Sequence, residues 1–396
     1  MSLTRKYIED QYIENLINYE NKRDDNNILY YYVVNPFCDW IVNFLPFWLA
    51  PNMITICGWF LNFLNLILTT YYTGWKGGGY IPPWVCFTCA FFNTAHILLY
   101  YLNGKQARRL NVSTPLDLLI AHGTESFNTF FLSIILGSFL YYSNIYQYLL
   151  FYFPIIRSFF LNTWEEYYKE ELIPPNINDV AERLFIIDIL IIISAVYGES
   201  FFNKKYLMFN KYKLKVSEIF GICVLIWGFY FSIKSIIGVL NSIRKEQIIF
   251  AIKDTLIYLY FGFTVLCIVF LTDSIIVKEY PKILLFMFGF QFCKITGILQ
   301  LSHILESPYK IYTTSFLIPF FALIIYSIVF YLTKFSLLIS IDNLIIITFI
   351  WNVASWAHYV YYCSEEICEI LNINIFKLGK RYSSRLSYEE LKRIKF

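Results

Sequence analysis

Apolar residues dominate this chain in long runs, and short polar segments separate the runs. Ten runs approach the roughly 20 residues that a helix needs to cross a bilayer. They lie near residues 53–72, 82–102, 116–142, 146–160, 184–202, 218–240, 255–277, 281–302, 311–332 and 344–363. Backbone groups inside lipid must pair within their own segment, which a helix achieves. The pattern therefore predicts an all-α, polytopic membrane helix bundle with about ten transmembrane helices.

Residues 37–49 are apolar but too short to span. Aromatic side chains such as Trp40 and Trp48 surround Asp39 and Asn43 there. This mixture is typical of an amphipathic helix that lies in the membrane–water interface. We therefore expect an N-terminal interfacial helix in addition to the spans.

Three regions follow from the charge pattern. Residues 1–36 form a polar head without the apolar stretch of a cleavable signal peptide. Residues 37–376 form the membrane domain, and residues 377–396 form a basic tail. Ten spans place head and tail together in the cytosol, but the Lys-rich loop 203–215 then lies outside, against the positive-inside rule. The side on which that loop lies stays open.

Composition supports a membrane location. Of the 396 residues, 58% are hydrophobic and only 15% are charged, too few to cover a soluble protein of this length. The net charge is +3 and no long basic run occurs, so nucleic acid is not expected as a partner. Cys86 and Cys89 form a CxxC inside a predicted span, where buried, reduced thiols are expected rather than a redox or zinc site.

The segment 102–126 reads LNGKQARRLNVSTPLDLLIAHGTES. It resembles the signature D-x2-D-G-x2-A-R-x8-G-x3-D-x3-D of the CDP-alcohol phosphotransferases, and most of all their choline and ethanolamine phosphotransferase branch. The residues in register are Gly104, Lys105, Gln106, Ala107, Arg108, Arg109, Ser113, Pro115, Leu116, His122 and Gly123. Shorter resemblances within 51–58, 164–182, 294–307 and 363–376 extend the match to about residues 40–380.

The resemblance implies a reaction, a cofactor and an assembly. In this family the hydroxyl of diacylglycerol attacks the phosphorus of CDP-choline or CDP-ethanolamine, and CMP leaves. Mg²⁺ or Mn²⁺ ions held by four aspartates neutralise the charge that develops on the phosphate. The resemblance also implies a dimer in the endoplasmic reticulum membrane.

The four metal-binding positions are altered in this chain. They are Tyr100, Asn103, Ala121 and Glu125, and Asp117 replaces the signature's second glycine. Asp117 and Glu125 would lie roughly 12 Å apart along one helix, whereas Mg–oxygen bonds measure about 2.1 Å. One ion cannot join both carboxylates. The sequence therefore predicts a degenerate site that binds no metal in the family's way.

Other residues of the signature keep a chemistry suited to ligands. The resemblance makes His122 and Glu125 the candidate catalytic residues, with His122 as a proton acceptor. The candidate substrate-binding residues are Asn52, Thr55, Gly104, Lys105, Ala107 and Arg108. Lys105 and Arg108 would contact a phosphate, or would simply be interfacial cations beside anionic lipid. Glu125 is equally compatible with a protonated side chain that packs between helices.

Several other polar residues within spans have structural explanations. We expect Asp188 and Lys294 to pair with neighbouring helices, and His96, His303 and His358 to be packed core residues.

These observations favour a phospholipid-biosynthesis membrane protein that is catalytically inactive or impaired. It would bind membrane lipids (diacylglycerol or phospholipid), with CDP-alcohol or CMP as further candidate ligands. It would form a homodimer, or a heterodimer with an active relative. The first alternative is an active CDP-choline or CDP-ethanolamine phosphotransferase that uses Mg²⁺ or Mn²⁺ in an altered site. The second is a lipid transporter or scramblase. The headgroup stays open.

Overall fold

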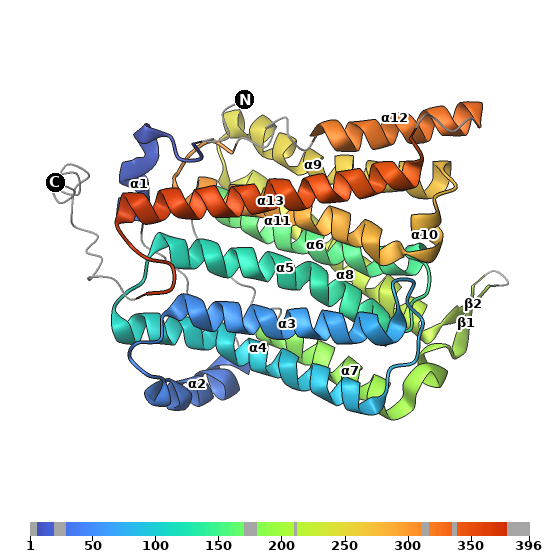
Figure 1. Cartoon of the computed structure of the whole chain (residues 1–396), viewed down its shortest axis with the longest axis horizontal. Coiled ribbons are helices and arrows are strands. Elements are labelled where there is room, and N and C mark those ends of the chain that lie inside the picture. The colour runs from blue at the N-terminus through green and yellow to red at the C-terminus, as the bar shows by residue number, and fades with distance from the viewer. Residues whose placement is uncertain are drawn as a thin grey trace.

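The computed structural model is an almost entirely helical bundle (Figure 1), described here for residues 6–19, 29–169, 180–209, 212–309, 317–334 and 339–377. Three short helical turns precede the main helices: η1 (Asp10–Tyr12), η2 (Tyr30–Val34) and η3 (Val42–Phe44). The α-helices are α1 (Ile13–Asn18), α2 (Asn35–Ile41), α3 (Pro51–Thr73), α4 (Pro83–Leu110), α5 (Pro115–Phe139), α6 (Ile145–Lys169), α7 (Val180–Phe202), α8 (Val216–Ser242), α9 (Lys245–Leu271), α10 (Ile275–Glu279), α11 (Pro281–Ile304), α12 (Leu317–Thr333) and α13 (Ile341–Leu371).

A helix occupies the described part of each of the ten predicted spans, which confirms the all-α class. Among the described residues, seven helices are long and apolar enough to cross a membrane: α3, α4, α7, α8, α9, α11 and α13. Helix α12 is apolar but shorter, with 17 residues. The chain is thus a multi-pass membrane protein, and the count of ten spans stays a prediction.

The loop 203–215 contains the two strands that the structure describes. Strand β1 (Lys205–Phe209) pairs antiparallel with β2 (Tyr212–Lys215), and the hairpin leads directly into α8. It lies at the opposite end of the bundle from α1 and α2 (Figure 1).

Helices α5 and α11 form the centre of the bundle. Helix α5 packs against α3, α6 and α11, and α11 also packs against α13. Both central helices bury most of their side chains, whereas α7, α8 and α13 leave large apolar side chains exposed on their outer faces. Outward apolar faces are suited to contact with lipid tails.

The helix ends are set by residues that cannot continue a helix or that cap one. Proline stands in the first turn of α3, α4, α5 and α11, where its missing N–H costs nothing. Asn111 ends α4 in the left-handed conformation, with φ of 54°. Thr114 then caps α5. The signature segment is therefore the C-terminal part of α4, a short turn and the N-terminal half of α5.

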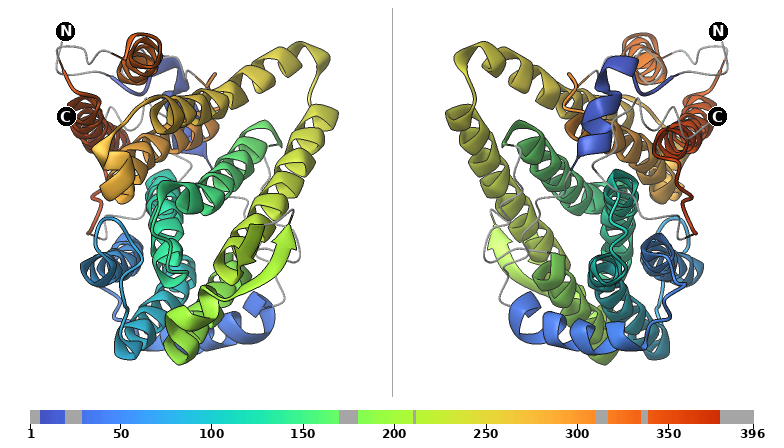
Figure 2. Two further views of the ribbon diagram at one scale, coloured as in Figure 1. Left: turned by 90° about the vertical axis from the view of Figure 1, so that its right-hand side faces the viewer. Right: turned by 90° about the vertical axis from the view of Figure 1, so that its left-hand side faces the viewer.

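Helix α2 lies across the bundle. In Figure 2, which looks at the ends of the bundle, α2 runs across the view while α3, α4 and α5 are seen nearly end on. The predicted interfacial helix at 37–49 corresponds to α2 and η3, which begin at Asn35 and end at Phe44.

The N-terminal segment is packed onto the end of the bundle that carries the signature. Ile8, Ile13, Leu16 and Ile17 are buried in one cluster with side chains of α5, α11 and α13. The backbone amides of Tyr7 and Ile8 donate to the Glu366 carboxylate at 2.9–3.0 Å. The described part of the polar head, residues 6–19, is therefore integral to the fold at this end.

Candidate functional site

The four positions that should hold metal form no carboxylate cluster. Asn103 is buried on α4, and Tyr100, one turn earlier, is half-buried with its ring edge-on to Tyr101. Ala121 and Glu125 are half-buried on α5. Among the described residues, no group of three or more His, Cys, Asp or Glu side chains has the geometry of a metal site.

Asp117 caps its own helix. Its carboxylate accepts the Thr114 backbone N–H at 2.7 Å, and the Asp117 N–H donates to the Thr114 hydroxyl at 3.3 Å. The two bonds form a capping box, which satisfies amides that the first turn leaves free. The Asn52 side chain lies close to the Asp117 carboxylate. The Asp117 carboxylate thus caps the start of α5.

Asn52 and Thr55 reach the same end of the bundle from α3. Asn52 is buried and its Nδ2 donates to the Ile375 carbonyl at 3.1 Å, so it joins α3 to the chain after α13. The Thr55 hydroxyl donates to the Pro51 carbonyl of its own helix at 3.4 Å. Asn52 therefore lies beside the α5 cap, while Thr55 is satisfied within α3.

The cations of the signature have different surroundings. Lys105 is buried and pairs with Asp39 and Asn35 of α2. Arg108 is exposed, and its guanidinium lies beside Gly104, one turn earlier. Within the described part of the chain, Arg108 has no hydrogen bond or ion pair. Of the two predicted phosphate contacts, Arg108 is thus the one with donors available to a ligand.

His122 belongs to a buried cluster that the sequence did not predict. Its Nε2 lies 4.0 Å from one oxygen of Glu166 on α6, and the other oxygen lies 3.9 Å from His303 Nε2 on α11. The Tyr19 hydroxyl contacts the same His303 nitrogen at 3.3 Å. One carboxylate thus stands between two imidazoles from different helices, and all three side chains are about nine-tenths buried.

Glu166 was the missed residue of this cluster. Glu165 and Glu166 are adjacent, and the sequence does not say which one faces inward. In the structure Glu165 pairs with Lys169 at 2.5 Å along the partly exposed face of α6, whereas Glu166 turns inward. Two acidic neighbours in an aromatic segment were the available signal, because only one can face the core of a helix bundle.

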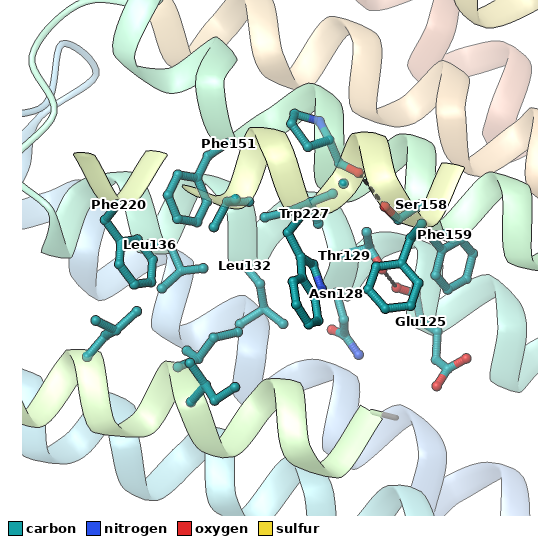
Figure 3. A pocket seen from close by; sticks show the side chains of 18 of the residues that line it. Glu125, Asn128, Thr129, Leu132, Leu136, Phe151, Ser158, Phe159, Phe220 and Trp227 are labelled. Atoms are coloured by element: carbon teal, nitrogen blue, oxygen red, sulfur yellow. Dashed lines mark hydrogen bonds between the residues drawn. The ribbon is translucent and has the colours of Figure 1, made fainter. Parts of the chain in front are cut away.

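Glu125 lines a cavity of about 280 Å³ between α5, α6, α7 and α8 (Figure 3). One end of the cavity is polar, with Glu125, Asn128 and Thr129 on α5. His96 also lines this end, and its Nε2 contacts Asn128 Nδ2 at 3.2 Å. The remaining lining is largely apolar and includes Leu132, Leu136, Phe151, Phe220 and Trp227.

The other polar residues for which a structural role was expected contact other segments of the chain. The Asp188 carboxylate accepts bonds from Asn93 at 2.8 Å and Thr94 at 2.9 Å, and Lys294 donates to Ser355 at 2.5 Å. His358 contacts the Tyr7 hydroxyl at 2.9 Å. Cys86 and Cys89 are buried, free thiols.

Comparison with known proteins finds relatives that cover most of the chain. No family model matches it. Ethanolaminephosphotransferase 1 of Mus musculus is 29% identical over 74% of this chain and 75% of its own length. Choline/ethanolaminephosphotransferase 1 of Saccharomyces cerevisiae is 24% identical over 81% of this chain and 85% of its own. An uncharacterized CDP-alcohol phosphatidyltransferase class-I family protein of Dictyostelium discoideum is 26% identical over 93% and 98%. The chain is therefore a homologue, at 24–29% identity over most of its length, of proteins named choline/ethanolamine phosphotransferases and CDP-alcohol phosphatidyltransferase class-I family proteins.

This homology raises the question of whether the side chains at the four signature positions can bind Mg²⁺. Mg²⁺ needs several hard oxygen ligands, usually carboxylates. Of the four positions, only Glu125 supplies a carboxylate, Asn103 supplies a neutral carbonyl and Ala121 supplies nothing. The Asp117 carboxylate caps α5 at Thr114 and lies eight residues, roughly 12 Å along the helix, from Glu125. The residues present do not fit the two-ion site that the family signature implies.

Proposed function

We propose that this protein binds membrane lipid, and a CDP-alcohol or CMP, at the family's site but is impaired in, or has lost, the metal-dependent transfer. The observation that carries the proposal is the donor set on α4 and α5. Without clustered carboxylates, ions cannot be held where the negative charge of phosphoryl transfer develops. The process served is phospholipid synthesis, which the family relationship supports.

The cavity beside Glu125 supports a lipid ligand. Its apolar walls suit an acyl chain, and Glu125, Asn128 and Thr129 form a polar end that suits a glycerol hydroxyl or ester. Diacylglycerol has this division between an apolar body and a small polar head. We therefore assign diacylglycerol, or a phospholipid with the same glycerol core, to this cavity.

Arg108 supports an anionic second ligand. Its guanidinium is exposed beside Gly104, which presents no side chain to hinder an approaching phosphate. A guanidinium forms paired bonds with phosphate oxygens. The diphosphate of a CDP-alcohol, or the phosphate of CMP, fits this chemistry.

A second candidate function is a working transferase with an altered site. The cluster of His122, Glu166 and His303 favours it. In such an enzyme the neutral His122 imidazole would accept the proton of the attacking lipid hydroxyl, and the Glu166 carboxylate would stabilise the resulting imidazolium. His303 would hold the other oxygen of Glu166. This candidate still requires another source of charge stabilisation at the phosphate.

We further propose the endoplasmic reticulum membrane as the location and a dimer as the assembly. An impaired chain would have a role as a homodimer or as the partner of an active relative. These assignments rest on the family resemblance.

The deciding experiment measures transfer of labelled phosphoethanolamine and phosphocholine from their CDP forms to diacylglycerol. Purified protein in liposomes is assayed with Mg²⁺ and with Mn²⁺, beside a variant carrying Tyr100→Asp, Asn103→Asp, Ala121→Asp, Glu125→Asp and Asp117→Gly. We expect turnover in the restored variant at least about 100-fold above the native protein, because one well-placed electrostatic stabiliser alone contributes about that factor. Native turnover equal to the restored variant would refute the impaired assignment and favour the second candidate.

A further inference from the structure

Lys105 is directed toward α2. Its Nζ donates to Asn35 Oδ1 at 2.5 Å and forms an ion pair with the Asp39 carboxylate. The Lys105 side chain is only 8% exposed, whereas Asp39 is 60% exposed. The cation is therefore enclosed between α4 and α2, with its charge balanced by this chain's own carboxylate.

Gln106 and Arg109 bind the backbone that follows α2. The Gln106 amide nitrogen donates to the carbonyls of Pro46 at 3.1 Å and Leu49 at 3.2 Å. Arg109 Nη1 donates to the carbonyls of Val42 at 2.5 Å and Leu45 at 2.8 Å. The Val42 and Pro46 carbonyls also accept the backbone N–H groups of Leu45 and Leu49, so the two side chains add bonds that join this stretch of backbone to α4.

The outer side of this region is a row of exposed aromatic rings. They are Phe37, Trp40, Phe44, Phe47 and Trp48, between 45% and 70% exposed. The Arg109 guanidinium also lies over the Phe47 ring, 4.1 Å from its centre. Aromatic rings of this kind concentrate at the level of lipid headgroups.

We propose that Lys105, Gln106 and Arg109 are positioning residues that clamp α2 onto α4, with the aromatic row seated in the headgroup region of the bilayer. The occupant of the row is the bilayer, because α2 lies across the axis of α3, α4 and α5 (Figure 2) and the enclosed Lys105 stands on its inner side. Together α2 and η3 span only residues 35–44, too short to be stable without tertiary contacts. The clamp therefore determines whether α2 forms. This inference does not depend on the proposed function.

Hydrogen exchange in liposomes tests the clamp. The amides of residues 35–44 are followed in the native protein, Lys105→Asp, Asp39→Lys and the double variant that exchanges the two charges. We expect each single variant to exchange about tenfold faster or more, because each loses the hydrogen-bonded ion pair between Lys105 and Asp39. The double variant should recover most of the protection. Arg108→Asp is the matched control on the same helix, and it should leave these amides unchanged.

Either of two results would overturn the clamp: native-like exchange in Lys105→Asp, or equal acceleration in Arg108→Asp. Asp39→Asn gives a milder variant if a charge reversal does not fold. The control separates the clamp from ligand binding, because only Arg108 is assigned to a ligand.

Tryptophan quenching tests the bilayer as the occupant. Vesicles carry bromines either near the glycerol end or near the methyl end of the acyl chains. The contribution of Trp40 and Trp48 is the difference between the native protein and a Trp40→Phe/Trp48→Phe variant. We expect at least about twofold stronger quenching by the shallow bromines, as for aromatic side chains at the interface. Absence of quenching of Trp40 and Trp48 would overturn the assignment. Quenching that falls as the protein-to-lipid ratio rises would also overturn it, because a second copy of this chain would then cover the aromatic row.

Discussion

The basic and the acidic positions of the signature differ in this chain. Among the basic-run residues, Lys105, Gln106 and Arg109 are paired with oxygen atoms of this chain. Among the four aspartate positions, three carry no carboxylate. Clustered carboxylates repel one another and need bound cations to be stable, whereas Lys105 is neutralised by Asp39 and Arg109 donates to backbone carbonyls. Positions that serve the fold and positions that serve a metal thus occupy one motif, and likeness at the first set does not establish function at the second.

The sharpest test of this difference is a metal-dependent stability. The variant with four restored aspartates and Asp117→Gly should unfold at a lower temperature than the native protein in EDTA, because its carboxylates repel. Added Mg²⁺ or Mn²⁺ should raise its midpoint by several degrees, since a ligand at about 100 times its Kd contributes about 2.7 kcal/mol. Thermal unfolding followed by intrinsic fluorescence measures both. The native protein is the control, and an equal rise in its midpoint would show that a metal site survives.

A smaller effect is expected from the buried cluster, which sequence likeness did not locate. Glu166→Ala should lower the free energy of unfolding by about 2 kcal/mol, because the buried carboxylate lies 4.0 Å from His122 and 3.9 Å from His303, and its removal leaves both buried imidazoles without this polar neighbour. Denaturant unfolding in detergent measures the change. Glu165→Ala is the matched control and should cost under about 0.5 kcal/mol, as expected for a partly exposed pair within one helix. Equal effects would mean that the inward orientation of Glu166 carries no special role.

The smallest effect concerns Asp117. If this residue caps α5, Thr114→Ala should destabilise the protein by about 1 kcal/mol, the usual cost of losing a helix N-cap. Ser113→Ala, at the exposed neighbouring position, should be neutral. If Thr114→Ala leaves the free energy of unfolding unchanged, the capping role of Asp117 is refuted. Asp117 is then again a candidate ligand residue.

Much of the fold was accessible from apolar run lengths, because each run long enough to cross a bilayer became a helix. Boundaries were less accurate: α9 starts at Lys245, ten residues before the predicted span at 255–277. Its first turns carry charged residues that hydropathy excludes but a helix extending beyond the apolar layer accepts. Residues 6–19 were expected as part of a polar head, yet Ile8, Ile13, Leu16 and Ile17 are buried against α5, α11 and α13. Residues 170–179 of the resembling segment 164–182, and residues 378–396 of the basic tail, lie outside the described residues.

The amino-acid sequence alone determined the helical membrane class, the family resemblance and the loss of the aspartates, since these depend on residue types and spacing along one chain. Only the tertiary structure decided which polar groups meet. It paired Lys105 with Asp39, 66 residues earlier, and left Arg108 exposed. It also brought Glu166 between His122 and His303 from three separate helices. The physical reason is that the direction of a side chain around a helix follows from packing against other helices, and residue spacing within one segment does not contain that information.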